Sequence, residues 1–176
     1  MRPLPRFIDV QVRGVAVEAV TERWVLLLCD PGERLVLPIP LGRAEARALA
    51  MLLQGRRGPR PSTHDLLGAT VASLDARVLR VDLRSVEGDR FQADVILQAQ
   101  GGRRIRLDAS AVDAVALALR AGAPIRASRA VLETARLPAD RPMPRASMAV
   151  IAGDTVGRAR LMADLADLAP DDLANC

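Results

Sequence analysis

The chain has 176 residues, half of them hydrophobic and 26% charged, so it can bury one globular core but not two full-sized ones. Every cationic side chain is arginine, and the net charge of +4 permits a phosphate-bearing partner without requiring one. Aromatic residues make up only 2%, which argues against single-strand binding through stacked aromatic rings.

Nothing in the sequence indicates export or insertion into a membrane. The basic start, Met1–Arg6, has no apolar stretch behind it, and the longest apolar runs, 24–29 and 114–119, fall far below the roughly 20 residues of a membrane span. Cys29 and Cys176 form no metal-binding or redox motif. We therefore expect a cytoplasmic protein with no membrane partner.

The first part of the chain predicts three strands. Apolar and polar residues alternate at 8–12, as in a half-buried strand. Two apolar runs follow at 24–29 and 34–39. Pro31 and Gly32 lie between these runs in positions that fit a type II turn, so the runs are expected to form a hairpin.

Two helices are predicted next. Apolar residues recur at helical spacing over 42–54, and a basic loop at 56–61 separates this helix from a second one at about 63–74. Ser62 or Thr63 is expected to cap the second helix, because both side chains can accept a hydrogen bond from a free backbone N–H group.

Three more strands and two more helices, with a short strand between the helices, are predicted over 79–135. The strands are predicted from alternating and turn-flanked segments. The predicted strands lie at 79–83, 91–97 and 105–107, the helices after the cap Ser110 and at 128–135, and the short strand at 125–127.

The C-terminal part differs in composition. Residues 136–146 are rich in proline and arginine, which is typical of a linker. Within 147–176, leucines at helical spacing predict an amphipathic helix. We therefore expect an α+β fold: a mixed β-sheet flanked by helices, forming a single domain at 1–135 with a C-terminal helical extension.

His64 is the single histidine of the chain. It stands in the first turn of the second predicted helix, directly after the basic loop, and Asp65 follows it. Because the positive end of a helix disfavours imidazolium, we expect a neutral ring that can act as base, acceptor or ligand. A lone histidine is more often structural, and Asp65 fits equally well as an ordinary first-turn carboxylate.

Acidic residues also stand where other helices begin: Glu45, Asp108 and Asp113. Free N–H groups at helix starts bind phosphate. If the helix starts converge, these three acids could hold Mg²⁺ or Mn²⁺ against a phosphodiester, with His64 and Asp65 completing a catalytic site. The alternative is that each acid only caps its helix, which stabilises the helix by about 0.3–1 kcal/mol.

Arginines near these helix starts are candidates for steering an anionic substrate. They are Arg43, Arg56, Arg57 and Arg60.

Three stretches resemble the bifunctional nuclease family: 37–46, 60–67 and 107–120. The specific part is Thr-His-Asp-Leu preceded by Arg-Pro, within the segment R-P-S-T-H-D-L-L. Shorter matches occur at 123–125 and 168–172, and the resemblance covers roughly residues 7–135.

This resemblance implies a nuclease that hydrolyses phosphodiester bonds in DNA and RNA with little sequence preference. It also implies nucleic acid as partner and assembly as a homo-oligomer. The positions that match the family are Glu45, Arg60, Thr63, His64, Asp65, Asp108 and Asp113; Thr63 joins the candidate nucleic-acid-binding residues on this ground.

Two positions depart from the family pattern. Family members commonly show Arg-Pro-Ser-Asp where this chain has Ser110-Ala111-Val112-Asp113, and Pro40 stands where an aromatic or branched residue is common. The departures keep an alternative open, in which the chain is a non-catalytic oligomeric module of the same fold with a binding or regulatory role.

Overall fold

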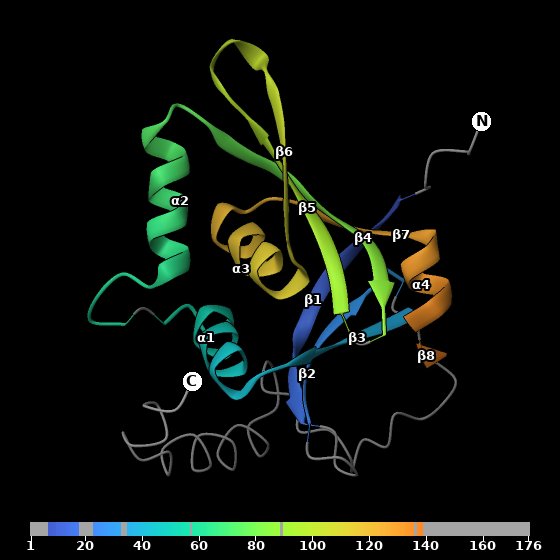
Figure 1. Cartoon of the computed structure of the whole chain (residues 1–176). Coiled ribbons are helices and arrows are strands. Elements are labelled where there is room, and N and C mark those ends of the chain that lie inside the picture. Colours follow the sequence, from blue (N-terminus) through green and yellow to red (C-terminus); the bar gives the residue numbers. More distant parts are fainter. Residues whose placement is uncertain are drawn as a thin grey trace, which may run out of the picture.

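The computed structural model describes residues 7–17, 23–32, 35–56, 58–88, 90–135 and 137–138. In this part of the chain, eight strands form one sheet and four α-helices pack against it (Figure 1). The strands are β1 (Phe7–Val17), β2 (Trp24–Cys29), β3 (Leu35–Leu41), β4 (Arg77–Glu87), β5 (Arg90–Gln98), β6 (Arg104–Ser110), β7 (Ile125–Ser128) and β8 (Leu137–Pro138). The helices are α1 (Arg43–Leu53), α2 (Thr63–Ser73), α3 (Ala111–Ala121) and α4 (Arg129–Ala135).

The sheet is mixed, as predicted. Its strand order is β6-β5-β4-β7-β1-β2-β3-β8, and every pair is antiparallel except β4 with β7. Helices α1, α2 and α3 lie together on one side, whereas α4 packs against β3, β4 and β7 on the other side (Figure 1). The prediction of a single α+β domain is confirmed.

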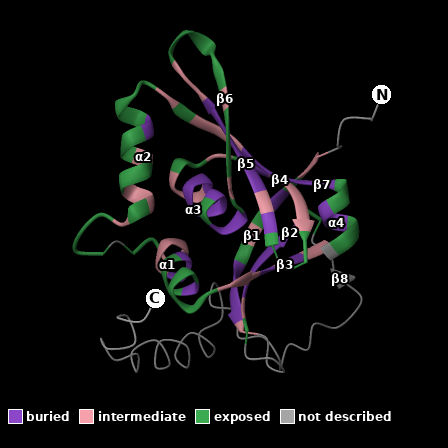
Figure 2. Cartoon of the chain, in the orientation of Figure 1, coloured by how far each residue is buried: buried purple, intermediate pink, exposed green. Residues whose placement is uncertain are grey.

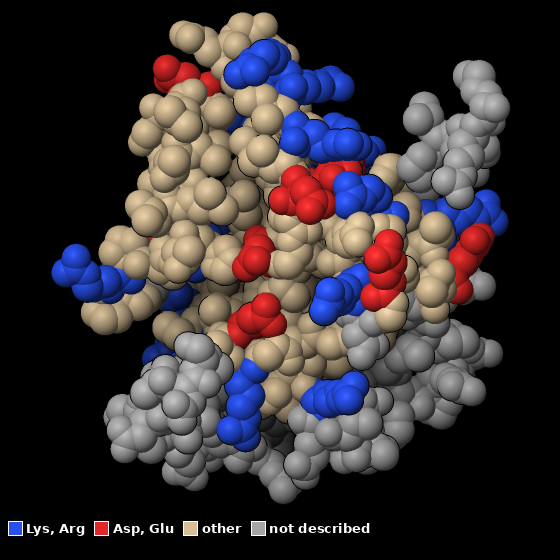
Figure 3. Space-filling view, in the orientation of Figure 1, with Lys and Arg blue, Asp and Glu red and all other residues tan. Residues whose placement is uncertain are grey.

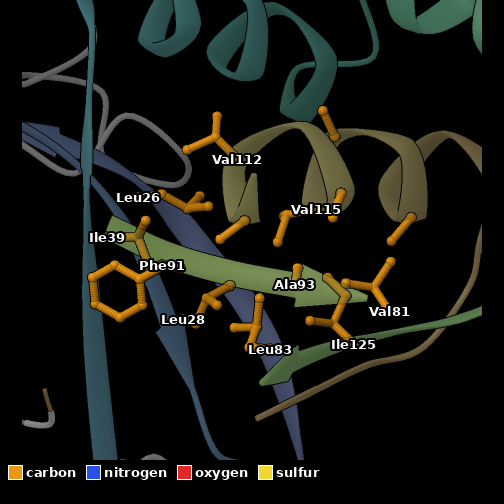
Figure 4. Packing of buried hydrophobic residues seen from close by; sticks show 14 of the residues in the cluster. Leu26, Leu28, Ile39, Val81, Leu83, Phe91, Ala93, Val112, Val115 and Ile125 are labelled. Carbon is orange, nitrogen blue, oxygen red and sulfur yellow. The ribbon is translucent and has the colours of Figure 1, made fainter. Parts of the chain in front are cut away.

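The core consists almost entirely of aliphatic side chains, as the scarcity of aromatic residues requires. Leu26, Leu28 and Leu83 are fully buried in the sheet and meet Val115 of α3 (Figure 4). Phe91 at the start of β5 packs beside Ile39 of β3. These two strands are each next to an edge strand, at opposite sides of the sheet, so one core extends across nearly the whole sheet. Helix α3 is the most deeply buried helix among the described residues, and α2 is largely exposed (Figure 2).

Helices α1, α2 and α3 begin with related caps. Glu45 accepts a hydrogen bond from the backbone N–H of Gly42 at 2.7 Å, and Asp65 accepts one from the N–H of Ser62 at 2.7 Å. Ser110 Oγ in turn accepts a bond from the N–H of Asp113 at 3.1 Å. These bonds satisfy N–H groups that no intrahelical carbonyl can reach. The cap of α2 is Ser62, one of the two residues predicted for it.

Charged side chains form one row across the outward face of the sheet. In register, Asp9 of β1 lies beside Arg126 of β7, followed by Asp82 of β4, Asp94 of β5 and Asp108 of β6. The hydrogen bond to Asp82 is the main reason that the pKa of Arg126 lies above its ordinary value. Asp82 and Asp94 are buried, and arginine side chains bond to both of them. The last residue of the row is Asp108, on the edge strand β6.

Part of the predicted linker, Leu137–Pro138, pairs with β3 as the two-residue strand β8. The rest of 136–146 and the predicted extension at 147–176 lie outside the described residues. No helix in the described ranges has the length and apolar character needed to cross a membrane.

Candidate functional site

The predicted site residues His64 and Asp113 are in direct contact. His64 Nε2 lies 3.1 Å from Asp113 Oδ1, which joins the start of α2 to the start of α3. The other carboxylate oxygen of Asp113 accepts a 2.7 Å hydrogen bond from Ser110 Oγ, so the carboxylate is held in one orientation. When Nε2 carries the proton and donates it to Asp113, Nδ1 of the neutral ring holds the lone pair.

A second contact holds the neighbouring residue. Arg120 lies two helical turns beyond Asp113 on α3, and its Nη1 lies 2.8 Å from Asp65 Oδ1. Its Nη2 donates a 2.9 Å hydrogen bond to Ser62 Oγ. Positions i and i+7 share one face of a helix, so α3 binds both His64 and Asp65 from one face. Sequence reasoning missed Arg120, although its spacing from Asp113 is a signal that could have suggested it.

A cavity of about 20 Å³ lies beside the His64–Asp113 pair. Polar side chains of Glu45, His64, Asp113 and Arg120 line it together with apolar residues of α1 and α3. This volume suffices for one water molecule, which also needs polar partners. Arg120 Nε–H is buried and has no protein hydrogen-bond partner among the described residues, so it is available to such a water.

A larger pocket of about 400 Å³ adjoins this cavity and shares Glu45 and Val112 with it. Asp108 lines this pocket and accepts a 2.8 Å hydrogen bond from Arg84 Nη2. Arg90 also lines it, and sequence reasoning did not single out either arginine. Figure 3 shows acidic side chains over α3 and between α3 and α1, with arginines nearby.

The structure thus brings four of the five predicted catalytic residues to two adjoining pockets. His64 and Asp113 line the smaller one, Asp108 lines the larger one, and Glu45 lines both. Asp65 is among the lining residues of neither pocket, and its carboxylate is engaged by the cap and by Arg120.

Of the residues predicted to bind nucleic acid, those that the structure describes line neither pocket. They are Arg43, Arg56, Arg60 and Thr63. Arg57 lies outside the described residues. In the part of the chain that the structure describes, no three His, Cys, Asp or Glu side chains are gathered closely enough to hold a metal ion as they stand.

Fold and site together define an α+β domain with acidic pockets and a histidine–aspartate pair where three helices begin. The chain belongs to the bifunctional nuclease domain family, whose model matches residues 25–140. Membership in this family indicates a nuclease-related function and, with it, nucleic acid as partner.

The chain is also similar to proteins of Mycobacterium tuberculosis. The uncharacterized proteins Rv1829 of strain H37Rv and MT1877 of strain CDC 1551 / Oshkosh are each 39% identical to this chain over 129 residues. The aligned region covers 73% of this chain and 76% of each relative.

Proposed function

We propose that the chain is a nuclease that hydrolyses phosphodiester bonds in DNA and RNA with little sequence preference. The observation that carries this proposal is the 3.1 Å contact of His64 with Asp113 beside a water-sized cavity. That cavity adjoins a pocket of about 400 Å³ that is open to a larger ligand. The family to which the chain belongs supports the same chemistry.

In this proposal His64 is the general base. A water in the small cavity gives a proton to Nδ1 of His64 and its oxygen attacks phosphorus. The bond from phosphorus to the leaving oxygen breaks, and the imidazolium returns the proton to that oxygen. Asp113, whose side chain is 59% exposed, holds the ring through Nε2 and stabilises the imidazolium while it exists, the role that an aspartate has in a catalytic triad.

Arginines supply the positive charge that a phosphate backbone requires. Arg90 lies in the larger pocket, where it can contact the reacting phosphate. We propose that Arg43, Arg56, Arg57 and Arg60, with the hydroxyl of Thr63, bind the flanking nucleic-acid backbone. Such contacts do not read base identity, which fits weak sequence preference.

Assistance by Mg²⁺ or Mn²⁺ remains part of the proposal. Mg²⁺ is usually held by one or two carboxylates together with substrate phosphates, so Glu45 and Asp108 of the larger pocket, with Asp113 beside them, fit a cation that binds with the substrate. When bound, the cation would polarise a phosphoryl oxygen. Glu45 would have to release the N–H of Gly42, and Asp108 the guanidinium of Arg84. The proton transfer through His64 does not depend on the cation.

One observation favours the alternative of a non-catalytic binding or regulatory module. Several of the candidate carboxylates already have partners within the chain. Glu45 and Asp65 bond to helix caps, Asp113 to Ser110 and His64, and Asp108 to Arg84. In this alternative the acids hold the fold together and the pockets bind a ligand without cleaving it.

We further propose that the protein self-associates, as the family resemblance implies, and that it is cytoplasmic, as its sequence led us to expect. Cys29 and Cys176 form no metal-binding or redox motif in the sequence, which fits the cytoplasmic part of this proposal. The surface that could support self-association is treated below.

Cleavage assays test the nuclease proposal. The purified chain is incubated with plasmid DNA and with RNA, with and without EDTA, beside His64→Ala and the surface control Arg47→Ala. We expect cleavage of both substrates by the wild type and by Arg47→Ala, and a loss of about a hundredfold or more for His64→Ala. Equal residual activity in the wild type, His64→Ala and a mock purification would leave the binding module as the better account.

A further inference from the structure

The edge strand β6 is unusually exposed for an edge of a folded sheet. It is the first strand in the sheet order, so one side has no strand partner within the described part of the chain. The opposite edge is β8, which has two residues and contains Pro138. Natural sheets blunt their edges with short strands, proline or bulges. β6 has seven residues without proline or glycine, and its pairing with β5 shows no register shift.

An apolar side chain lies at the middle of this edge. Leu107 is 45% exposed, whereas Ile105 and Ala109, two residues away on the same face of the strand, are half-buried against the core. On the other face, Arg106 and Asp108 stand on either side of Leu107, and their side chains are 69% and 78% exposed.

We propose that β6 pairs in antiparallel fashion with β6 of a second copy of this chain. The strand spans Arg104–Ser110, so its midpoint is Leu107, and pairing over the full length must centre on this residue. Leu107 then meets its own copy. In the same register Arg106 lies opposite Asp108 of the partner subunit, and Asp108 lies opposite Arg106 of the partner subunit.

Charge complementarity indicates a second copy rather than an edge left open to water. Charged residues on an edge strand can prevent pairing with the edge strand of another copy. For that purpose they would all have the same sign, because like charges opposite each other destabilise a strand pair. Here opposite signs flank the centre, so twofold pairing creates two favourable charge pairs. Moving the twofold axis by one residue, to Arg106, would oppose two arginines and leave Ala109 and Ser110 without partners in the strand, although Arg104 would then face Asp108 of the partner subunit. The register centred on Leu107 is favoured because it pairs the whole strand and avoids the contact between arginines.

The pairing also bears on the candidate site. Asp108 lines the larger pocket, so Arg106 of the partner subunit would bring a second cation to its rim. This inference rests on the self-association proposed above and not on cleavage. It is therefore tested by measuring mass, which separates its failure from a failure of the nuclease proposal.

Sedimentation velocity and light scattering on the full chain test the pairing through charge reversal. We expect a dimeric wild type and, for Arg106→Asp and Asp108→Arg alone, a dissociation constant raised at least about tenfold, since two attractive pairs become repulsive in each. An equimolar mixture of the two variants should recover the dimer. One subunit of the mixed pair then carries aspartate at both positions and the other carries arginine at both, so each contact across the axis joins opposite charges. The control Arg47→Asp, an exposed residue of α1, should leave the dimer unchanged.

Three results would overturn the proposal. They are a monomeric wild type, a dimer that withstands both single reversals, and a failure of the mixed variants to associate. Circular dichroism establishes first that each variant is folded, so a failure of the mixed variants to associate reports on the interface.

Discussion

At the scale of single residues, the segment containing His64 is held by two side chains of α3. Asp113 contacts His64, and Arg120 contacts Asp65 and Ser62. Arg120 transfers no proton in the proposed mechanism, although its Nε–H is available to the water of the small cavity. Its two Nη contacts fix the start of α2 and thereby the place of His64.

Replacing Arg120 should therefore destabilise the fold. Arg120→Ala removes two charge-assisted hydrogen bonds from a side chain that is only 20% exposed, so we expect a loss of roughly 1–2 kcal/mol in the free energy of unfolding. The matched control is Arg129→Ala, which removes the exposed pair with Glu133 and should cost about 0.3–0.5 kcal/mol. Urea unfolding of both variants measures the difference, and equal losses would contradict the proposed role of Arg120.

Sequence reasoning reached some of these residues and not others, for a physical reason. Caps such as Ser62 and Ser110 are local, because a side chain bonds to a backbone group three residues away. The contact of Arg120 with Ser62 spans 58 residues and depends on how α3 lies against α2. The spacing of Asp113 and Arg120 places both on one face of α3, but no local pattern indicates that this face meets the start of α2.

At the scale of elements, glycines distinguish two kinds of helix position. Gly68 lies inside α2, where an added Cβ would meet no atom within 4 Å. Gly122 ends α3 in the left-handed region with φ 63°, which favours glycine because a Cβ there strains the backbone.

The two alanine substitutions should consequently act in opposite directions. Gly68→Ala should raise the free energy of unfolding by about 0.5–1 kcal/mol, since alanine restricts the unfolded chain and favours helix. Gly122→Ala should lower it by about 1–2 kcal/mol. Thermal and urea unfolding of both variants test this. Destabilisation by Gly68→Ala would contradict the finding that a Cβ at this position meets no other atom.

Periodicity and turn residues predicted the elements well, because strands and helices follow from patterns two to four residues apart. The order of the strands in the sheet could not be predicted from such short-range patterns. β7 inserts between β1 and β4 and makes the one parallel pairing described, and no pattern within a few residues of β7 indicates this placement.

At the scale of the whole molecule, the proposed function depends on the convergence of the helix starts. The sequence could place an acid at the starts of α1, α2 and α3 but could not show that Glu45, His64 and Asp113 line one cavity. The structure establishes this proximity. It also shows that Asp65, the residue next to His64 in the chain, serves the cap and Arg120.

The most direct test of the proposed nuclease is a double-mutant cycle on the His64–Asp113 pair. Cleavage rates are measured for the wild type, His64→Ala, Asp113→Asn and the double variant, all shown to be folded by circular dichroism. If the pair acts as one unit, each single change lowers the rate about a hundredfold or more, and the double variant is no slower than the slower single one. Rates near the wild type for both single variants, or losses that multiply in the double variant, would contradict a catalytic His64–Asp113 pair.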